Sequence, residues 1–516
     1  MTLALAHSRA RTGVHAPAVR VEVYLAPGLP ALNIVGLPEA AVRESRDRVR
    51  AAIHCAQFEF PNRRITVNLA PADLPKHGGR FDLPIAIGIL AANGVVDVQS
   101  LSRIELLGEL SLTGELRPID AVLPAALAAT QSGRALIVPL ANGEEAALAN
   151  DCDVFVARTL LEVVAHLNGE KSLSRALRNV DSFLPALYAD LADVRGQAQA
   201  RRALEVAAAG AHHLIFIGPP GCGKTLLASR LPGLLPEADE AEALECAVLA
   251  SVSGQGFDLS RWRVRPFRAP HHTASAIALV GGGNGPRPGE ISLAHHGVLF
   301  LDELAEWGRH SLEVLRQPLE SGVVTISRAA GTCEFPARFQ LVAAMNPCPC
   351  GWAGDPSGRC RCTLELVLRY RSRLSGPLLD RIDLQVSVPR LAPHEMRGDA
   401  PRGESTLAVR ARVLAARERQ QLRCGKTNAH MRQDETERFC RLHDRDQAML
   451  ERAMAALQLS ARATQRILRV ARTIADLDGS DHIGTGHLSE AIGYRQLDRD
   501  EMRPAALPRK VEQDVA

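Results

Sequence analysis

One short stretch of the sequence has the residue types and spacing that bind phosphate. The segment GPPGCGKT matches the pattern G-x-x-x-x-G-K-[ST]. Its glycines let backbone N–H groups close around phosphate oxygens at a helix N-terminus, where the helix dipole favours an anion. We expect Lys224 to reach the β- and γ-phosphates of a nucleotide and Thr225 to bind magnesium. The full predicted loop is Gly218, Pro219, Pro220, Gly221, Cys222, Gly223, Lys224 and Thr225.

A second stretch, NPCPCGWAGDPSGRCRC, places two Cys-x-Cys pairs behind Asn346. Four thiolates are enough for a closed tetrahedral zinc site. The loop between the pairs is too poor in apolar residues to fold around a core, so a metal would fix it. Cys-x-Cys is tighter than the usual Cys-x-x-Cys, and reduced thiols in a mobile loop or a redox sensor are the alternatives. We favour structural zinc bound by Cys348, Cys350, Cys360 and Cys362.

Polar side chains follow two more apolar segments. GVLFLDE ends in Asp302 and Glu303, and FQLVAAMNP contains Asn346. In a nucleotide hydrolase, Asp302 would hold the magnesium shell and Glu303 would orient and activate the attacking water. The neutral amide of Asn346 could hydrogen-bond that water without competing for its proton. These residues and the phosphate loop therefore predict ATP and magnesium as cofactors.

Two arginines are candidates for contacts with the nucleotide. Arg381 lies in SGPLLDRID, after a short predicted helix. Hydrolysis of this kind gains from an arginine supplied across a subunit boundary. Arg462 lies at the start of a predicted helix for which Ser460 is a plausible N-cap and Gly479 a stop. A surface salt bridge is the commoner fate of either arginine alone.

Composition limits the class of protein. The chain has 516 residues and a net charge of +3, so it can form two or three domains but has no global basic field that attracts nucleic acid. The opening MTLALAHSRAR is too short an apolar run for a signal peptide. There is no apolar run of about 18 residues, so we expect no membrane span. A cytoplasmic location with reduced thiols follows as the expectation.

The chain divides into three predicted regions. Residues 1–174 read as mixed α/β, with strands such as VRVEVYL, an amphipathic helix in EAAVRESRDRVRAAI and a buried helix in DLPIAIGILAANGVV. Residues 175–390 alternate strands and helices, and HLIFIG is a continuous apolar strand typical of a parallel sheet. Residues 391–516 are helical and rich in arginine. The predicted class is α/β with a helical C-terminal lid.

Several blocks together resemble one family. They include DVRGQAQARRALEVAAAGAHHLIFIGPPGCGKT, PFRAPHHTAS, PGEISLAHHGVLFLDEL, LRQPLESGVVTISRAAG, AAMNPCPCG and SGPLLDRIDL. Over nearly the whole chain they are similar to the YifB/ComM proteins, which are magnesium-chelatase-like AAA+ ATPases. The resemblance implies a ring, typically a hexamer, that works as a DNA helicase and promotes branch migration during natural transformation. It also implies sensor-one, trans-acting finger and sensor-two roles for Asn346, Arg381 and Arg462.

The resemblance adds an insert and a hairpin to the core. RPFRAPHHTASAIALVGGGNGPRPGE looks like the family's helix-two insert. VVTISRAAGTCEF reads as a β-hairpin, and such hairpins line the central pore of related rings. Arg328 near its tip could touch a DNA phosphate, although a packing hairpin is the alternative. His271 and His272 lack a cysteine or carboxylate at metal spacing, so we expect a structural role for them.

The N-terminal region is similar to the proteolytic (S5-like) domain of Lon. Lon proteases use a Ser–Lys dyad, but Arg80 occupies the serine slot here and Leu123 the lysine slot. A nucleophilic serine needs a base within hydrogen-bond reach. We therefore expect a Lon-like fold without peptidase activity. Lys76 and Arg80 are expected to bind DNA or to form a solvated surface.

Three classes of function remain open. The leading hypothesis is an ATP-driven DNA translocase that binds branched or single-stranded DNA as a homo-oligomer. A second is the motor subunit of a magnesium chelatase, although no block resembles a porphyrin-binding or integrin-like partner domain. A third is a protease or protein-remodelling ATPase, and the missing dyad argues against the protease.

Overall fold

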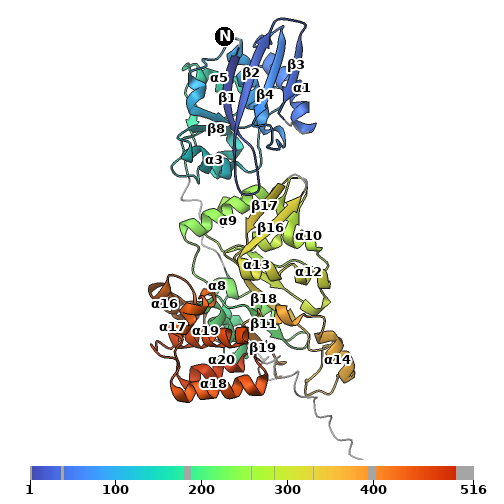
Figure 1. Ribbon diagram of the computed structural model, residues 1–516, viewed down its shortest axis with the longest axis vertical. Helices are drawn as coiled ribbons and strands as arrows, with labels where there is room; N and C mark the ends of the chain where they lie inside the picture. The colour runs from blue at the N-terminus through green and yellow to red at the C-terminus, as the bar shows by residue number, and fades with distance from the viewer. Residues whose placement is uncertain are drawn as a thin grey trace, which may run out of the picture.

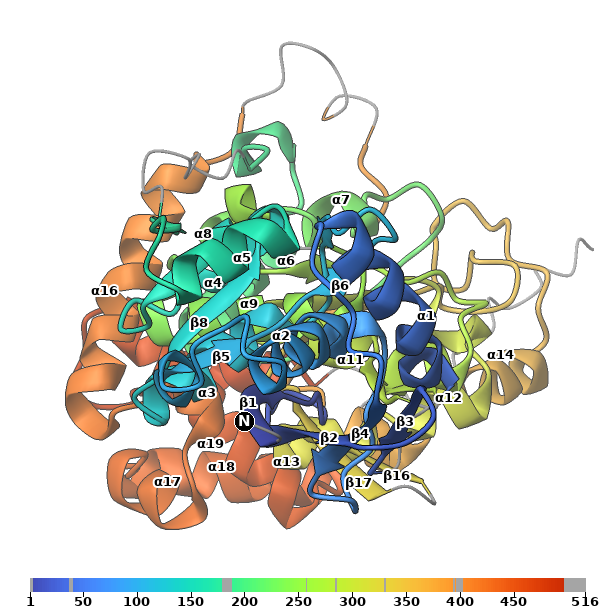
Figure 2. The ribbon, with the colours of Figure 1, turned by 90° about the horizontal axis from the view of Figure 1, so that it is seen from above.

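The computed structural model describes residues 3–36, 40–178, 188–256, 258–283, 285–328, 331–392, 395 and 402–495. The molecule is elongated, with the N-terminal region at one end, a central sheet region, and a helical region at the other end (Figure 1). Seen along the long axis, the C-terminal helices and α14 (Leu364–Arg371) lie on opposite sides (Figure 2). Among the described helices, none combines the length and the apolar composition that a bilayer span needs.

The N-terminal region is a mixed eight-stranded sheet with helices. The strand order is β10-β9-β8-β5-β1-β2-β4-β3. Alternate residues of β2 are buried, which is the pattern of a sheet covered on one face. The strands are β1 (Leu3–Arg9), β2 (Ala18–Ala26), β3 (Ala31–Val35), β4 (Arg64–Ala70), β5 (Ile104–Leu106), β8 (Ala135–Pro139), β9 (Val154–Ala157) and β10 (Ser174–Arg175). The other elements are α1 (Ala40–Cys55), α2 (Asp82–Ala92), β6 (Glu109–Leu110), β7 (Leu116–Arg117), α3 (Val122–Gln131), α4 (Gly143–Ala146) and α5 (Leu160–Leu167).

Both predicted helices of this region are confirmed. Val42, Val49 and Ile53 of α1 are fully buried, and every residue of α2 is buried. The expectation for Lys76 and Arg80 is wrong, because both side chains are buried. The Lys76 ammonium donates to the carbonyl oxygen of Pro71, and the Arg80 guanidinium donates to the carbonyl oxygens of Arg9 and Asp120. Neither group forms a surface that DNA could reach.

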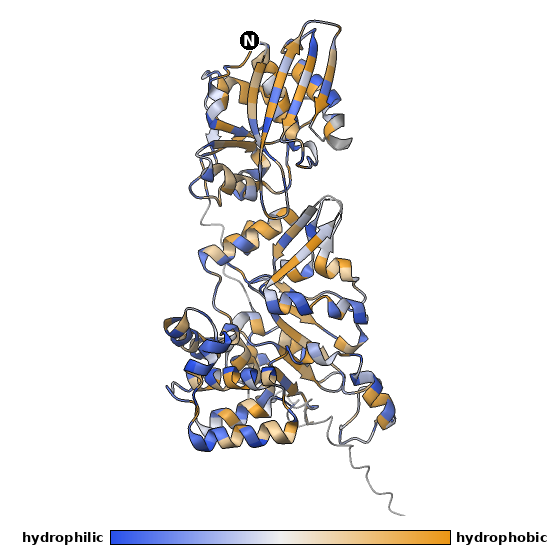
Figure 3. Cartoon of the chain, viewed as in Figure 1, coloured by the Kyte–Doolittle hydropathy of each residue, from blue (hydrophilic) through white to orange (hydrophobic). Residues whose placement is uncertain are grey.

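The central region is built on a five-stranded parallel sheet in the order β12-β15-β18-β11-β19. The strands are β11 (Leu214–Ile217), β12 (Phe267–Arg268), β15 (Val298–Leu301), β18 (Gln340–Met345) and β19 (Leu384–Ser387). β11, β15 and β18 are buried at every residue, as expected when helices cover both faces of a sheet. Figure 3 shows strands of this sheet mostly in the colour of hydrophobic residues. The segment expected as an insert thus contributes β12, an edge strand of the sheet.

Short helices and hairpins surround this sheet. They are α6 (Ala198–Gly210), α7 (Lys224–Ala228), α8 (Leu231–Leu234), α9 (Glu240–Ser253), α10 (Ala276–Val280), α11 (Glu290–Leu293), α12 (Arg309–Glu313) and α13 (Arg316–Ser321). The strands β13 (Gly281–Gly282) and β14 (Arg287–Pro288) pair with each other. The predicted hairpin is confirmed as β16 (Val323–Arg328) paired with β17 (Gly331–Pro336), and its tip lies outside the described residues.

The N-terminal and central regions share a hydrophobic cluster. It joins α3 and its neighbours to Ala243 and Ala247 of α9 and to Trp262. Polar contacts reinforce the joint, because the Ala121 N–H donates to the Ser251 carbonyl oxygen at 3.1 Å. Arg287 of the β13–β14 hairpin also pairs with Asp120 at 3.1 Å.

The C-terminal region is a helical layer against the central sheet. Its helices are α16 (Thr406–Cys424), α17 (Gln433–Phe439), α18 (Asp444–Leu457), α19 (Ala461–Leu477) and α20 (Thr485–Gly493), and α15 (Gly376–Leu379) precedes β19. The predicted N-cap is confirmed, since the Ser460 side chain accepts from the Ala463 N–H. Ile467, Val470 and Ile474 of α19 join the same buried cluster as β11.

Candidate nucleotide-binding site

The predicted phosphate loop and the predicted polar residues meet at one edge of the parallel sheet. Ile217 pairs with Met345 and Leu301 with Ala343, so Gly218 and Asn346 follow adjacent strands at the same level, and Asp302 follows the next strand two positions below Asn346. Ligands bind at the carboxyl ends of such strands. The pocket there has a volume of about 380 Å³. It is lined by Pro220, Gly221, Cys222, Gly223, Lys224, Thr225, Leu226, Asp302, Glu303, Met345 and Asn346.

Glycines are required in this loop. A Cβ on Gly218 would lie 2.2 Å from the carbonyl oxygen of Val388, so no side chain fits there. Gly223 has φ 93°, a left-handed conformation that glycine adopts without strain. Gly223 caps α7, and the first backbone N–H groups of that helix therefore face the pocket.

Lys224 is buried at the centre of the loop. Its ammonium donates to the carbonyl oxygens of Gly218 at 2.7 Å and Pro219 at 3.0 Å, and to Asn346 Oδ1 at 3.2 Å. Burial lowers the pKa of Lys224. The ammonium is thus held by neutral oxygens, and an anionic phosphate is a stronger partner for it than any of them.

Two oxygen groups that suit magnesium lie beside the lysine. The Thr225 hydroxyl donates to Asp302 Oδ2 at 2.7 Å, and the Glu303 N–H donates to Asp302 Oδ1 at 2.8 Å. The indole of Trp307 donates to the Asp302 carbonyl oxygen at 2.9 Å and fixes the strand end. Magnesium prefers one or two protein oxygens together with water and phosphate, and Thr225 and Asp302 fit that requirement.

Glu303 has an unusual backbone and an unexpected partner. Its φ of 50° is in the left-handed region, which costs energy for a residue with a side chain and is frequent at active sites. Its carboxylate pairs with His272 Nδ1 at 3.0 Å. The sequence predicts only a structural role for His272, and no spacing in it indicates the pair with Glu303. The neighbouring His271 instead hydrogen-bonds Thr273 at 2.9 Å.

The two arginine candidates lie elsewhere. Among the described residues that line the pocket, neither Arg381 nor Arg462 is present. Arg381 is buried and donates to the Pro377 carbonyl oxygen and to Glu320. Arg462 is exposed, and its guanidinium lies 3.9 Å from Glu320.

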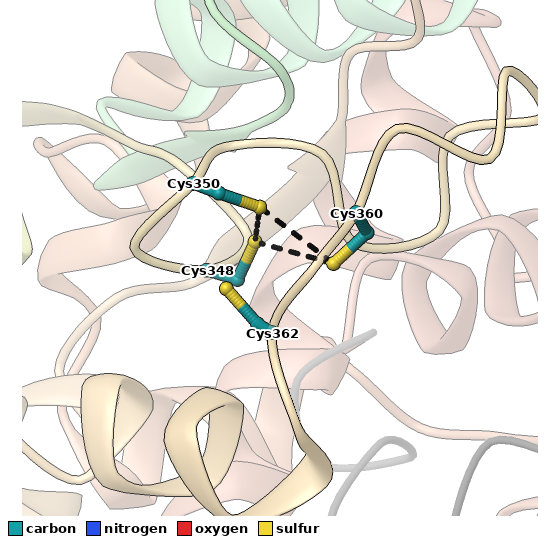
Figure 4. Close-up of side chains that lie close together, drawn as sticks. All are labelled: Cys348, Cys350, Cys360 and Cys362. Atoms are coloured by element: carbon teal, nitrogen blue, oxygen red, sulfur yellow. Dashed lines mark hydrogen bonds between the residues drawn. The ribbon is translucent and has the colours of Figure 1, made fainter.

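The four predicted cysteine ligands converge (Figure 4). The Sγ–Sγ distances are 3.3 Å for Cys348–Cys350, 3.9 Å for Cys348–Cys360 and 3.7 Å for Cys350–Cys360. Four sulfurs at Zn–S bonds of about 2.3 Å would be about 3.8 Å apart. The two distances to Cys360 match this value, and the Cys348–Cys350 distance of 3.3 Å is shorter. Burial opposes ionisation of Cys350, but the backbone N–H groups of Arg361 and Trp352 lower its pKa to about 6, while burial and the neighbouring thiols raise the pKa of Cys360 and Cys362. The residues therefore fit a zinc ion.

The cysteine loop packs on the phosphate loop. Gly351 has φ 83°, and a Cβ there would lie 2.7 Å from Pro220 Cδ and 3.9 Å from the amide carbon of Asn346. The chain that follows the first Cys-x-Cys pair thus lies against Pro220 of the phosphate loop.

A second group with metal-binding side chains consists of Glu245, His295 and His296. His295 Nδ1 accepts the Arg338 N–H at 2.9 Å, so the proton of the neutral ring is on Nε2. That Nε2 lies 2.7 Å from Glu245 and donates to it. Burial lowers the pKa of His295 to about 4 and keeps the ring neutral. The arrangement is a hydrogen-bonded link between α9 and β15, with no free ring nitrogen on His295 for a metal.

Comparison with known proteins agrees with these features. The families described as "Magnesium chelatase, subunit ChlI", "Subunit ChlI of Mg-chelatase" and "Magnesium chelatase, subunit ChlI C-terminal" match residues 190–396, 21–142 and 403–495. The chain is 53% identical to the competence protein ComM of Haemophilus influenzae over 97% of this chain and 98% of that one. It is 51% identical to YifB of Escherichia coli, with the same coverage of 97% and 98%. The magnesium-chelatase 38 kDa subunit of Cereibacter sphaeroides is 27% identical over 46% of this chain and 66% of that one. The chain therefore belongs to the ComM/YifB magnesium-chelatase-like family.

Proposed function

We propose that this protein is an ATP-hydrolysing, ring-forming DNA translocase of the ComM type, which promotes branch migration during recombination in natural transformation. The observation that carries the ATPase is the meeting of Lys224, Thr225, Asp302, Glu303 and Asn346 at one sheet edge. The 53% identity to the competence protein ComM over nearly the whole chain supports a role in competence, and the DNA substrate is what the resemblance to this family implies. In this proposal residues 1–174 form a non-proteolytic domain, 175–390 the ATPase core and 391–516 the lid.

Each pocket residue has a distinct task in hydrolysis. Lys224 would exchange its carbonyl partners for phosphate oxygens, and Thr225 and Asp302 would hold magnesium, which screens the phosphate charge. Glu303 would leave His272 and orient and activate the attacking water. The amide of Asn346, already 3.2 Å from the Lys224 ammonium, would contact the same water or the γ-phosphate.

Arg381 and Arg462 would complete the site of a neighbouring subunit. They lie outside the pocket lining of their own chain, and hydrolysis gains from an arginine supplied across a boundary. Their position supports a ring, and by resemblance to the family we propose a cytoplasmic hexamer. The β16–β17 hairpin would face DNA in the central pore. Arg328 is the last residue of β16.

The N-terminal region would be Lon-like without peptidase activity. In the serine slot, the Arg80 guanidinium is buried against the backbone oxygens of Arg9 and Asp120. In the lysine slot, Leu123 is fully buried in a hydrophobic cluster. Neither residue supplies a nucleophile or a base. The cysteine loop would hold one structural zinc, which sets the geometry behind Asn346.

The test is ATP hydrolysis by the purified protein with no DNA, with duplex DNA, and with forked or four-way junctions. We expect branched DNA to stimulate hydrolysis and the protein to convert a four-way junction into separated duplexes in the presence of ATP. The Lys224→Ala variant is the control for contaminating ATPases. Hydrolysis that ignores every DNA would overturn the DNA function and favour the magnesium-chelatase-like motor suggested by the 27% identity to a chelatase subunit, or a protein-remodelling ATPase.

A further inference from the structure

One carboxylate connects both arginine candidates. Glu320 of α13 accepts from Arg381, which follows α15, and its Oε1 lies 3.9 Å from the guanidinium of Arg462 at the start of α19. These three elements are far apart in the sequence. Arg381, which is buried, and Arg462, which is exposed, therefore share a single acidic side chain within one subunit.

The two arginines are held differently. The side chain of Glu320 is 52% exposed and that of Arg462 is 76% exposed, whereas that of Arg381 is 8% exposed. The ion pair with Arg462 is therefore weak, and a more highly charged anion competes for Arg462 at little cost. Arg381 Nε is buried and has no hydrogen-bond partner among the described residues, which leaves one donor of this guanidinium unused.

Glu320 is also joined directly to the hairpin. Helix α13 ends at Ser321, Gly322 turns the chain with φ 68°, and β16 begins at Val323. The Ala337 N–H donates to the Gly322 carbonyl oxygen at 2.8 Å, so this turn closes the base of the β16–β17 hairpin. A Cβ on Gly322 would lie 2.9 Å from Arg338 Cγ, which leaves the turn little freedom. A movement of Glu320 would thus be transmitted to both hairpin strands.

We infer that Glu320 is a latch that couples the nucleotide of a neighbouring subunit to the hairpin of its own subunit. This inference rests on the proposed function of Arg381 and Arg462 in trans. When the neighbouring subunit has no ATP bound, Glu320 pairs with both arginines and holds α13 and the base of the β16–β17 hairpin against them. When the neighbour binds ATP, the γ-phosphate takes the arginines, Glu320 loses its partners, and the hairpin base is released. Glu320 is a positioning residue and does not contact the reacting atoms.

The test compares Glu320→Gln with Glu313→Gln. Glu313 is a matched control because it pairs with Arg316 at 2.6 Å in the same part of the chain and contacts neither Arg381 nor Arg462. Hydrogen–deuterium exchange of the hairpin amides, at 323–328 and 331–336, is measured in assembled rings with and without a non-hydrolysable ATP analogue, in the absence of DNA. We expect the analogue to speed exchange in wild-type and Glu313→Gln protein. In Glu320→Gln protein, exchange should be fast from the start and should not respond.

Kinetics give a second readout. Freed of the competing carboxylate, the arginines of Glu320→Gln rings should lower the KM for ATP by about two- to fivefold, the range of a weak ion pair. DNA stimulation of hydrolysis should fall toward onefold. A hairpin that ignores the analogue in wild-type rings, or that responds equally in Glu320→Gln rings, would overturn the latch. So would a parallel loss of hydrolysis as in Arg381→Ala, since Glu320 would then only orient Arg381. Wild-type hydrolysis that ignores DNA would instead overturn the proposed DNA function, and the exchange experiment would still decide the latch.

Discussion

Lys224 and Glu303 line the same pocket, but replacing Lys224 should impair nucleotide binding and replacing Glu303 should impair hydrolysis. Lys224→Ala removes the only ammonium that lines the pocket in the described structure, so we expect nucleotide binding to be lost. Glu303→Gln keeps the size and polarity of the side chain but removes the basic oxygen, so binding should persist while turnover falls by about 10²- to 10⁴-fold. Fluorescent-nucleotide binding and phosphate release measure the two properties separately.

Glu306→Gln is the matched control for Glu303→Gln. Glu306 pairs with Arg373 at 3.0 Å and does not line the pocket. It undergoes the same change of charge three residues further along the chain. Its hydrolysis rate should stay close to that of the wild type. Turnover by Glu303→Gln at the wild-type rate would remove Glu303 from its proposed role.

The individual pocket residues could be predicted because the carboxyl ends of parallel strands meet at one edge. Asp302 and Asn346 follow continuous apolar strands, and the structure places them beside Lys224 and Thr225. The partner of Glu303 could not be predicted in this way. His272 reaches it from the segment after β12, and that contact depends on tertiary packing rather than on spacing. The same holds for Glu320 and its two arginines.

The burial of charged residues is also hard to predict from the sequence. Lys76 and Arg80 look like surface groups in the sequence, since such residues are seldom buried without partners. The structure supplies those partners as backbone carbonyl oxygens of Pro71, Arg9 and Asp120. The carbonyl oxygens of Arg9 and Asp120 come from distant parts of the chain, so no local pattern announces them.

At the scale of elements, the loop that carries the cysteines should depend on zinc. Purified protein is expected to contain about one zinc per chain by metal analysis, because four thiolates complete one tetrahedral site. Replacing Cys350 and Cys360 with serine should release the metal and loosen the loop that packs on Pro220. Cys55→Ser is the control, because Cys55 is exposed and lies in α1. Freshly prepared, reduced protein without zinc would contradict the site.

The parallel sheet should also weaken in mild acid. Burial lowers the pKa of His213 to about 4, and its Nδ1 accepts the Leu341 N–H at 3.0 Å at the start of β18. The unfolded chain takes up a proton at this ring below about pH 6.5, while the folded chain resists until about pH 4. The stabilisation is therefore complete above pH 6.5 and is lost as the pH falls toward 4.

His213→Asn isolates this contribution. The asparagine amide oxygen can accept the same N–H, but it does not titrate. Between pH 7.5 and pH 5 the wild type should lose roughly 2 kcal/mol of stability at this position, and the variant should lose none there. The thermal midpoint, measured at both pH values, should fall further in the wild type than in His213→Asn. An equal fall in both proteins would show that the ring does not titrate as argued.

The order of the strands in the parallel sheet is harder to predict than the existence of the individual strands and helices. Apolar runs indicate β11, β15 and β18. An apolar stripe at helical spacing between Ser460 and Gly479 indicates α19 and its ends. β12 has only two residues and lies in a segment that looked like an insert. Its place at the sheet edge depends on pairing with β15, which no property of a two-residue segment specifies.

At the scale of the whole molecule, one segment links the nucleotide pocket to the N-terminal region. The β13–β14 hairpin pairs with Asp120 through Arg287, and the segment that leads to it carries His272 against Glu303. The β16–β17 hairpin begins three residues after Glu320, the acid that contacts Arg381 and Arg462. A ring built from such subunits would transmit a change at one nucleotide site to both hairpins. This requires that a complete site contains residues of two chains.

Mixed rings test that requirement. Arg381→Ala protein should bind ATP normally and hydrolyse it about 10³- to 10⁵-fold more slowly, because the guanidinium stabilises charge that develops on the γ-phosphate. Glu303→Gln protein should also be inactive, for want of the basic carboxylate. In rings that contain both variants, some interfaces pair an intact Glu303 with an intact Arg381 from the next subunit. Part of the hydrolysis should then return when the two variants are mixed, whereas rings made of one variant alone should stay inactive. Fluorescence energy transfer between differently labelled subunits checks that mixed rings form. If they form and no activity returns, Arg381 acts within its own chain or not on the nucleotide at all.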